Sequence, residues 1–199
     1  MVAESDSTAS LVRAAQQGDR AAFQALYEQY EERVFRTALR LLGRRPEAED
    51  LTQEVFVTAY RKLDTFDHRS SFATWLYRTT VNACYDAMRK KKRRSGSEGE
   101  MPDRAPDASL LRTARSDSPE DQAQQRELRQ QVDTALQTLS PKLRTTFVLR
   151  EIEGLSYQDI AQAMDCAEGT VASRLARARE QLADLLRKAG VDPPSSEEP

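Results

Sequence analysis

A polar stretch rich in glycine and proline near the middle of the chain divides the sequence into two parts. Residues 95–119, SGSEGEMPDRAPDASLLRTARSDSP, lack the apolar periodicity found on both sides. Such a composition buries too little apolar surface to offset the entropy lost when the backbone is ordered. We therefore predict a flexible acidic linker at residues 96–118, with one domain at residues 8–95 and another at residues 119–190.

The first domain is predicted to be helical throughout. Apolar residues recur every three or four positions between residues 23 and 41, which places them on one face of a helix that Gly43 can end. Pro46 suits the first position of the next helix, and one of the serines at 70–71 can cap a third. This third helix, FATWLYRTTVNACYDAMRKKKRR, becomes more basic toward its end.

The second domain also has helical periodicity, and the chain carries no strand pattern. The apolar face of one predicted helix is formed by Leu143, Phe147 and Ile152. This helix should stop at Gly154, and Ser156 can then cap a short helix that has Asp159 three residues on. The predicted fold class is all-α, with two small helical domains joined by the linker.

A helix-turn-helix pattern occupies residues 156–182, SYQDIAQAMDCAEGTVASRLARAREQL. The side chains expected to face its core are Ile160, Ala161, Met164, Val171 and Leu175. The small residues Ala161 and Gly169 suit the close approach of two helices that cross at a steep angle. The second helix carries Arg174 and Arg177 near its start, where arginine side chains in a DNA-binding protein reach base edges and phosphates.

Charge is segregated along the chain. The 30 lysines and arginines and 32 acids give a net charge of −2, which argues against a uniformly basic surface that coats nucleic acid. Cations are concentrated at residues 89–94 and in the last predicted helix, whereas acids collect in the linker and the tail. Each basic run is also compatible with a solvated helix face, so the runs alone leave DNA binding open.

Several classes of function are disfavoured by what the sequence lacks. No apolar run approaches the roughly 18 residues of a membrane span, and no signal-peptide pattern begins the chain, so we expect a cytoplasmic protein without membrane insertion. Cys84 and Cys166 are isolated, which suggests neither a disulfide nor zinc, and both are expected to be small buried residues. With one histidine and no phosphate-binding loop, we expect no enzyme, cofactor, metal or small-molecule substrate.

Three ordered motifs resemble those of a known family. They are DLTQEVFVTAYRKLDTF, SSFATWLYRTTVNACYDAMRKKKRR and GLSYQDIAQAMDCAEGTVASRLARARE, with the acidic linker before the third. Over about residues 8–187 the chain is similar to bacterial extracytoplasmic-function (ECF) sigma factors of RNA polymerase, in the RpoE-like subgroup of the sigma-70 family. The resemblance implies that the two domains, sigma region 2 and sigma region 4, bind core RNA polymerase and direct it to a two-part promoter in a stress or envelope response.

The first motif resembles the polymerase-binding segment of the family. The matching residues are Asp50, Gln53, Glu54 and Phe56. The resemblance implies that their helix docks on the clamp coiled coil of the largest catalytic subunit. An amphipathic, partly acidic helix suits that task, although without the motif an ordinary core helix with a solvated acidic face is equally compatible.

The second motif resembles the segment that opens the minus-ten promoter element. Its loop, LDTFDHRSS, implies capture of a flipped base, and such a pocket makes strand opening depend on sequence. The residues implied to contact this element are Phe66 and Asn82 for bases and Arg78, Arg89, Lys90 and Lys91 for phosphates. His68 is expected to be an exposed loop residue, and Trp75 is expected to pack in the core.

The third motif resembles the recognition helix for the minus-thirty-five element. The residues at the implied contact positions are Thr170, Ala172, Ser173, Arg174 and Arg177. Two positions depart from the family pattern, because Ala167 stands where proline is common and Ala172 where arginine or lysine is frequent. We therefore expect one base or phosphate contact to be missing and the promoter preference to differ.

The resemblance also implies an anti-sigma factor that holds the protein inactive by occupying its polymerase- and DNA-binding faces. Two other functions stay open at this point. A conventional helix-turn-helix regulator would bind duplex DNA tightly without polymerase, but it would leave the aromatic and basic third helix without a role. A recombinase would need a nucleophile and an arginine-rich active site, which cannot be assembled from these residues.

Overall fold

The computed structural model describes residues 6–95 and 131–189, and every regular element in these two ranges is helical. The predicted linker at residues 96–118 and the predicted start of the second domain lie outside the described residues. The elements of the first part are α1 (Asp6–Gln16), α2 (Arg20–Leu42), α3 (Arg45–Lys62), the 3₁₀ turn η1 (Leu63–Thr65) and α4 (Phe72–Ser95). Those of the second part are helical residues 131–138, α6 (Pro141–Phe147), the π-helical turn η2 (Val148–Ile152), α7 (Tyr157–Met164) and α8 (Glu168–Lys188).

Helix α2 has a defined residue at each end. The side chain of Asp19 accepts hydrogen bonds from the backbone N–H groups of Ala21 and Ala22, and so caps the start. At the other end Gly43 adopts φ 73°, and its N–H donates to the carbonyl of Leu39 at 2.8 Å. Because the left-handed conformation is strained for residues with a Cβ atom, glycine ends this helix at little energetic cost. The predicted stop at Gly43 is confirmed.

Two serine caps predicted from the sequence are also present. Ser71 Oγ accepts a hydrogen bond from the N–H of Thr74 at 3.0 Å, at the start of α4. Ser156 Oγ accepts from the N–H of Asp159 at 3.1 Å, at the start of α7. Each bond satisfies a donor that the first turn of a helix leaves without an intrahelical partner.

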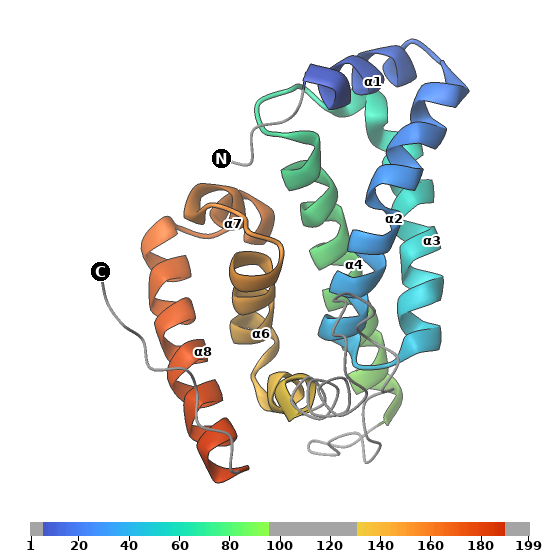
Figure 1. Cartoon of the computed structure of the whole chain (residues 1–199). Helices are drawn as coiled ribbons and strands as arrows, with labels where there is room; N and C mark the ends of the chain where they lie inside the picture. The colour runs from blue at the N-terminus through green and yellow to red at the C-terminus, as the bar shows by residue number, and fades with distance from the viewer. Residues whose placement is uncertain (1–5, 96–130, 190–199) are drawn as a thin grey trace, which may run out of the picture.

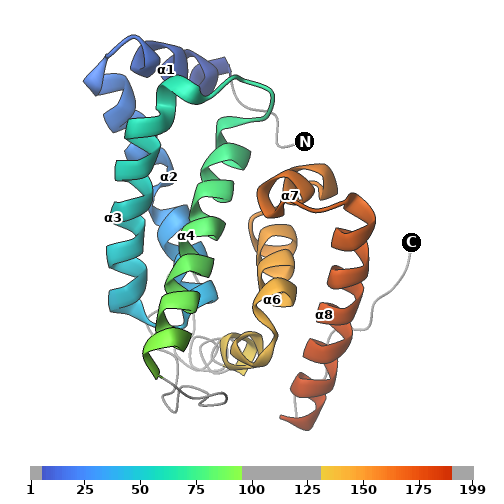
Figure 2. The same cartoon turned by 180° about the vertical axis from the view of Figure 1, so that it is seen from behind.

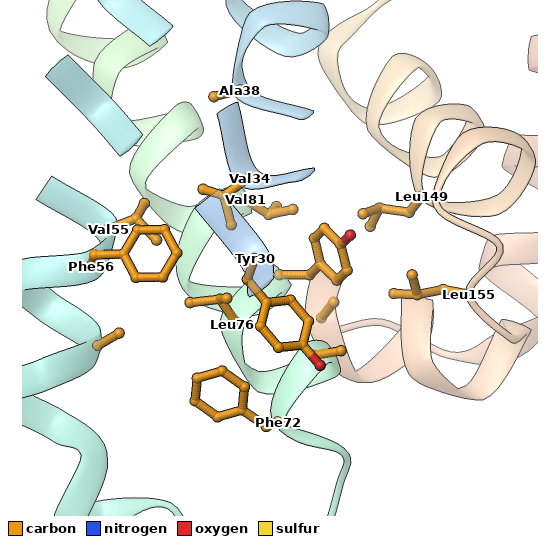
Figure 3. Packing of buried hydrophobic residues seen from close by; sticks show 14 of the residues in the cluster. Tyr30, Val34, Ala38, Val55, Phe56, Phe72, Leu76, Val81, Leu149 and Leu155 are labelled. Atoms are coloured by element: carbon orange, nitrogen blue, oxygen red, sulfur yellow. The ribbon is translucent and has the colours of Figure 1, made fainter. Parts of the chain in front are cut away.

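The main hydrophobic core includes residues from both parts of the chain. Tyr30, Val34, Phe72 and Leu76 of the first part lie in the same buried cluster as Leu149 and Leu155 of the second (Figure 3). A smaller cluster lies entirely within the second part and is formed by Ala135, Leu136, Leu139, Ala178 and Leu182. The second part therefore has a small core of its own and completes its burial against the first.

The two parts pack directly on each other. Helix α7 packs against α4, while α6 and η2 contact α2. Both views show α6 and α7 beside α4, with α8 on the side of the second part that faces away from α3 (Figures 1 and 2). The two helical parts predicted from the sequence are therefore in contact and do not depend on the linker alone for their placement.

Two details differ from the prediction. Ile152 was expected on an apolar face but is 39% exposed, because the π-helical turn of Val148–Ile152 inserts extra backbone and rotates the last residues away from that face. Gly169 was expected to permit a close helix approach, yet a Cβ atom at that position would meet nothing within 4 Å. Glycine is therefore not needed there for packing.

Candidate polymerase and promoter interfaces

Helix α3 presents an exposed acidic face. Asp50, Gln53 and Glu54 are all exposed, and their spacing of three and four residues places them on one side of the helix. Phe56 was predicted to belong with them, but it is only 5% exposed and its ring packs edge-on against Tyr27 with centroids 4.7 Å apart. The structure therefore places Phe56 in the core, where it orients the helix and does not face a partner.

Exposed apolar side chains lie on α3 beyond the acidic residues, and the sequence reasoning did not identify them. Val57 is 49% exposed and Tyr60 is 51% exposed, and the Tyr60 ring packs edge-on against Phe23 at 4.9 Å. Val57 lies seven residues after Asp50, two helical turns along the same face, and this spacing was the signal available in the sequence. Large exposed apolar residues beside charges are typical of a helix that docks on another protein.

Helix α4 carries most of the predicted minus-ten residues on one face. Arg78, Asn82 and Arg89 are exposed and recur at helical spacing, and Lys90 is exposed beside them. Arg89 is paired with Asp86 on the next turn toward the N-terminus, and Lys91 Nζ lies 3.6 Å from a carboxylate oxygen of Glu47 on α3. The face is basic, but two of its cations already have carboxylate partners.

The loop before α4 places the predicted base-contacting Phe66 in the core. Phe66 is 4% exposed, and its ring lies 5.5 Å from that of Trp75 and 6.1 Å from that of Phe72. The side-chain amide of Gln16 fixes the loop by donating to the carbonyls of Leu63 at 3.0 Å and Phe66 at 2.9 Å. In this arrangement the Phe66 ring supports the loop from within and is not available to a base.

His68 occupies the exposed surface of the same loop. It adopts φ 58°, its ring is tilted over Phe66 at 4.7 Å, and its Nε2 lies 3.0 Å from Gln16 Oε1. The exposed position predicted for His68 is confirmed. No sequence signal pointed to Gln16, because its partners are backbone carbonyls about 50 residues away.

The predicted recognition helix α8 follows a left-handed turn. Asp165 has φ 48°, and both its N–H and that of Cys166 donate to the carbonyl of Ala161. Ala167 precedes the helix with φ −72°, a value that proline also adopts, so this departure from the family pattern leaves the turn compatible with either residue. Of the side chains predicted to point inward, Ile160, Ala161, Val171 and Leu175 are buried, whereas Met164 is half-buried.

The predicted DNA-facing residues of α8 differ in exposure. Ala172, Ser173 and Arg177 are exposed, whereas Thr170 and Arg174 are half-buried. Arg174 Nη1 lies 3.5 Å from the sulfur of Cys166. Burial raises the pKa of the Tyr85 hydroxyl on α4, and the nearby positive charge of Arg174 opposes that rise. Arg174 is therefore partly covered by the turn that precedes α8.

A buried cluster of polar side chains joins the two parts at Glu153. This residue is only 8% exposed. Its carboxylate accepts hydrogen bonds from the hydroxyls of Tyr77 and, at 3.0 Å, Thr37, and Arg33 Nε lies 3.4 Å from it. Burial raises the pKa of Tyr77, and the negative charge of Glu153 raises it further.

Asp159 forms a second polar contact between the two parts. Its Oδ1 accepts a hydrogen bond from Thr74 Oγ1 of α4 at 2.9 Å, and its Oδ2 accepts from Ser156 Oγ at 2.5 Å. The sequence reasoning used Asp159 only as part of a helix cap and did not single out Glu153. No local pattern pointed to Glu153, because its partner Thr37 lies 116 residues away in the sequence.

Other kinds of site were sought in the described ranges. Among residues 6–95 and 131–189, no group of three or more histidine, cysteine or acidic side chains could hold a metal ion. None of the helices in these ranges combines the length and apolar character needed to cross a bilayer.

The chain is similar to proteins of one family along most of its length. Residues 26–94 match the family Sigma-70 region 2, and residues 129–182 match Sigma-70, region 4. The ECF RNA polymerase sigma-E factor of Haemophilus influenzae is 37% identical, over 94% of this chain and 98% of that protein. The RNA polymerase sigma-H factor of Pseudomonas aeruginosa is 38% identical, over 90% of this chain and 95% of that protein.

Two solved structures have a similar arrangement of helices. One is the sigma factor RpoE in complex with the anti-sigma factor NepR from Bartonella quintana. It has a TM-score of 0.66 and 29% sequence identity to this chain, and the match covers 83% of this chain and 96% of the solved chain. The other is CnrH in complex with the cytosolic domain of CnrY. It has a TM-score of 0.65 and 26% sequence identity to this chain, and the match covers 92% of this chain and 99% of the solved chain.

Proposed function

Because this chain belongs to the ECF sigma factors of the sigma-70 family, we propose that its three exposed faces divide the tasks of transcription initiation. Members of this family bind core RNA polymerase and promoter DNA, and they direct initiation without catalysing a reaction themselves. The proposal assigns one task to each of α3, α4 and α8. The observation that carries it is that each of these helices exposes polar or charged side chains at helical spacing, mainly acidic on α3 and basic on α4 and α8.

The α3 face is proposed to dock on core polymerase. Asp50, Gln53 and Glu54 supply charge and hydrogen-bonding groups, and Val57 supplies apolar area next to them. An interface needs a desolvated apolar centre as well as a polar rim, and this face offers both. Phe56 is assigned a supporting role, because its burial against Tyr27 holds α3 in position.

The α4 face is proposed to contact the minus-ten element. Asn82 has an amide that can pair with a base edge, while Arg78, Arg89 and Lys90 are placed to neutralise phosphates. Lys91 is a further phosphate candidate once it leaves Glu47. Phe66 is assigned to the support of the loop, and His68 lies on the loop surface from which a flipped base would be reached.

The start of α8 is proposed to contact the minus-thirty-five element in the major groove. Thr170, Ser173, Arg174 and Arg177 share one face of the helix. The alanine at 172 is exposed and has no polar atom in its side chain, so it can offer only apolar contact, for example to a thymine methyl group. The promoter preference should therefore differ from that of relatives with a cation at this position.

An anti-sigma factor is proposed as the regulatory partner, and a cytoplasmic location and a stress response as the setting. One similar solved structure contains RpoE with the anti-sigma factor NepR, and the other contains CnrH with the cytosolic domain of CnrY. The exposed apolar residues Val57 and Tyr60 give an inhibitor a surface that overlaps the proposed polymerase-docking face. Competition for that face would link inhibition directly to loss of polymerase binding.

Transcription from a genomic DNA library with bacterial core polymerase, with and without the protein, tests the proposal. Sequencing of the transcript starts should give protein-dependent starts that share a two-block upstream motif. Arg177→Ala should weaken dependence on the upstream block, whereas Arg187→Ala is the matched control, since Arg187 lies near the end of α8 and pairs with Asp184. The opposite result would be no protein-dependent starts together with tight duplex binding by the protein alone, as expected of a conventional regulator.

A further inference from the structure

We propose that Gln16, in the last turn of α1, is a positioning residue for minus-ten recognition, because its side-chain amide sets the shape of the loop at residues 63–71. This inference rests on the proposed function of that loop, whose outer face is where a flipped base would be reached. It extends the minus-ten site to a helix that lies outside all three sequence motifs, since the first of them begins at Asp50.

The amide of Gln16 contacts three points of the loop. Its Nε2 donates to the carbonyls of Leu63 at 3.0 Å and Phe66 at 2.9 Å, and its Oε1 lies 3.0 Å from Nε2 of His68. A primary amide has two N–H donors and one carbonyl oxygen, so both donors and the oxygen are engaged. Because the two backbone carbonyls can only accept, they fix the orientation of the amide and require a hydrogen on Nε2 of His68.

The carbonyls that Gln16 binds belong to the turn that ends α3. The last carbonyls of a helix have no intrahelical partner, and the carbonyl of Leu63 also accepts from the N–H of Phe66 at 3.0 Å. The side chains of Leu63 and Phe66 are 2% and 4% exposed, so the turn packs against the core and its carbonyls need donors from the protein. Gln16 donates to both carbonyls, which ties the backbone at the two ends of the turn to α1.

The contact with His68 acts on the strained part of the loop. His68 has φ 58°, a left-handed conformation that is uncommon for a residue with a Cβ atom. Such a conformation persists where neighbouring contacts over-determine it, and it is frequent at sites that bind ligands. The contacts here are the bond to Gln16 and the packing of the His68 ring on Phe66 at 4.7 Å. Arg69 pairs with Asp67 at 2.6 Å across this residue, so the turn at His68 brings together the exposed polar side chains of the outer face.

Helix α1 provides a fixed support for the amide. Val12 and Ala15 of α1 are buried in the main core, and Thr8 Oγ1 accepts a hydrogen bond from Gln29 Nε2 of α2 at 3.1 Å. Both views show α1 lying across the end of the first part where α3 ends and the loop begins (Figures 1 and 2), and α1 contacts both η1 and α4. A side chain on a packed helix places its polar atoms more precisely than a side chain on a loop.

A loop of fixed shape favours base capture in two ways. Ordering of a flexible loop on binding costs free energy, and a loop that is already ordered avoids this cost. A loop with one shape also discriminates between bases, because a wrong base leaves polar groups without partners, whereas a flexible loop can adapt. Loss of the Gln16 amide should therefore weaken binding of the single-stranded minus-ten element and relax its sequence preference. Recognition of the upstream element by α8 and docking by α3 should not change.

Two substitutions remove the ties between α1 and the loop. Gln16→Glu keeps the shape of the side chain but replaces the two donor hydrogens with an acceptor oxygen, which then faces the carbonyls of Leu63 and Phe66. Gln16→Leu removes every polar atom of the side chain at similar volume and adds no charge. The matched controls are Gln17→Glu and Gln17→Leu, because they make the same chemical changes at the next residue, which is exposed.

The primary measurement is binding of single-stranded DNA by core polymerase that carries the full-length protein. The probe is an oligonucleotide with the minus-ten element mapped from the transcript starts, together with a set in which each base of the element in turn is replaced by an abasic site. In the wild type, loss of the captured base should weaken binding about tenfold, equivalent to 1.4 kcal/mol at 25 °C. In both Gln16 variants this ratio should fall to about twofold or less, and in both Gln17 variants it should stay at the wild-type value.

A role in the fold alone predicts a different pattern. Variants of Gln16 would then bind the intact and the abasic oligonucleotides more weakly by the same factor, and the ratio would keep its wild-type value. That result in folded variants, as judged by urea unfolding, overturns the inference. Failure of both Gln16 variants to fold overturns it as well, because the amide would then serve the fold as a whole. Failure of the proposed function would look different, because no abasic position would weaken binding even in the wild type.

Discussion

Replacement of Phe66 separates a role in the core from a role in base capture. The ring is 4% exposed and lies within 6.1 Å of three other rings, those of His68, Phe72 and Trp75. Truncation of a core phenylalanine to alanine costs about 3–5 kcal/mol, and each lost ring pair contributes about 0.5–1.5 kcal/mol beyond the buried area. We therefore expect Phe66→Ala to lower the free energy of unfolding by about 3–5 kcal/mol.

Phe66→Leu gives a graded version of the same change. Leucine keeps most of the apolar volume but loses the ring pairs, so we expect a loss of about 1–2 kcal/mol. Urea unfolding can be followed by the fluorescence of Trp75, since the chain has a single tryptophan and its ring lies 5.5 Å from Phe66. Asn82→Ala is the comparison, because an exposed substitution should change stability by less than about 0.5 kcal/mol while reducing transcription.

The reasoning would be refuted by a stable Phe66→Ala protein. Suppose that the free energy of unfolding of this variant lay within about 1 kcal/mol of the wild-type value and that the variant still failed to open promoters. The ring would then have to leave the core and contact DNA during initiation. If instead stability and transcription fell together, and Phe66→Leu recovered both in proportion, the ring acts through the fold of the loop.

Three further predictions concern thiol reactivity, the pH dependence of stability and polymerase binding. Burial raises the pKa of the Cys84 thiol to about 12 from 9.0, so its thiolate fraction at pH 8 is about a thousandfold below that of an ordinary cysteine. Alkylation of the folded protein followed by mass spectrometry should therefore modify the half-buried Cys166 and spare Cys84. Equal alkylation rates at the two cysteines would contradict the buried position of Cys84. Because unfolding returns the Cys84 pKa to its ordinary value, its contribution to stability is complete below pH 9 and is lost as the pH rises toward 12. The double variant Asp50→Ala, Glu54→Ala should weaken core polymerase binding at least tenfold in a pull-down titration. The free energy of unfolding should not fall, since both side chains are exposed. If the double variant bound polymerase with wild-type affinity, the α3 face would not be the docking surface.

The helices and their ends were largely predictable from the sequence, because the signals are local. Gly43, Ser71 and Ser156 end or begin helices through backbone conformation or a hydrogen bond to a residue three or four positions away. Ile152 was misplaced for an equally local reason, because its apolar side chain fits a helical repeat that the π-helical turn interrupts. No simple periodicity identifies such a turn.

The candidate sites were predicted less completely, because burial depends on contacts distant in sequence. The motif around Phe66 suggested a base contact, but only the positions of Phe72 and Trp75 reveal that the ring is enclosed. Glu153 looked like an ordinary acidic residue before a glycine, and its partner Thr37 lies 116 residues away. Local patterns identify the exposed faces, whereas the contacts between the two regions are visible only in the tertiary structure.

The shared core of the two regions would make a molecule with separated regions short-lived. Separation would uncover Leu149, Leu155 and Ile160 together with the side chains of α4 that now cover them. Newly uncovered apolar surface attracts chaperones and proteases, and it promotes aggregation. A molecule whose regions separated without a partner to cover this surface is thus expected to reclose or to be degraded.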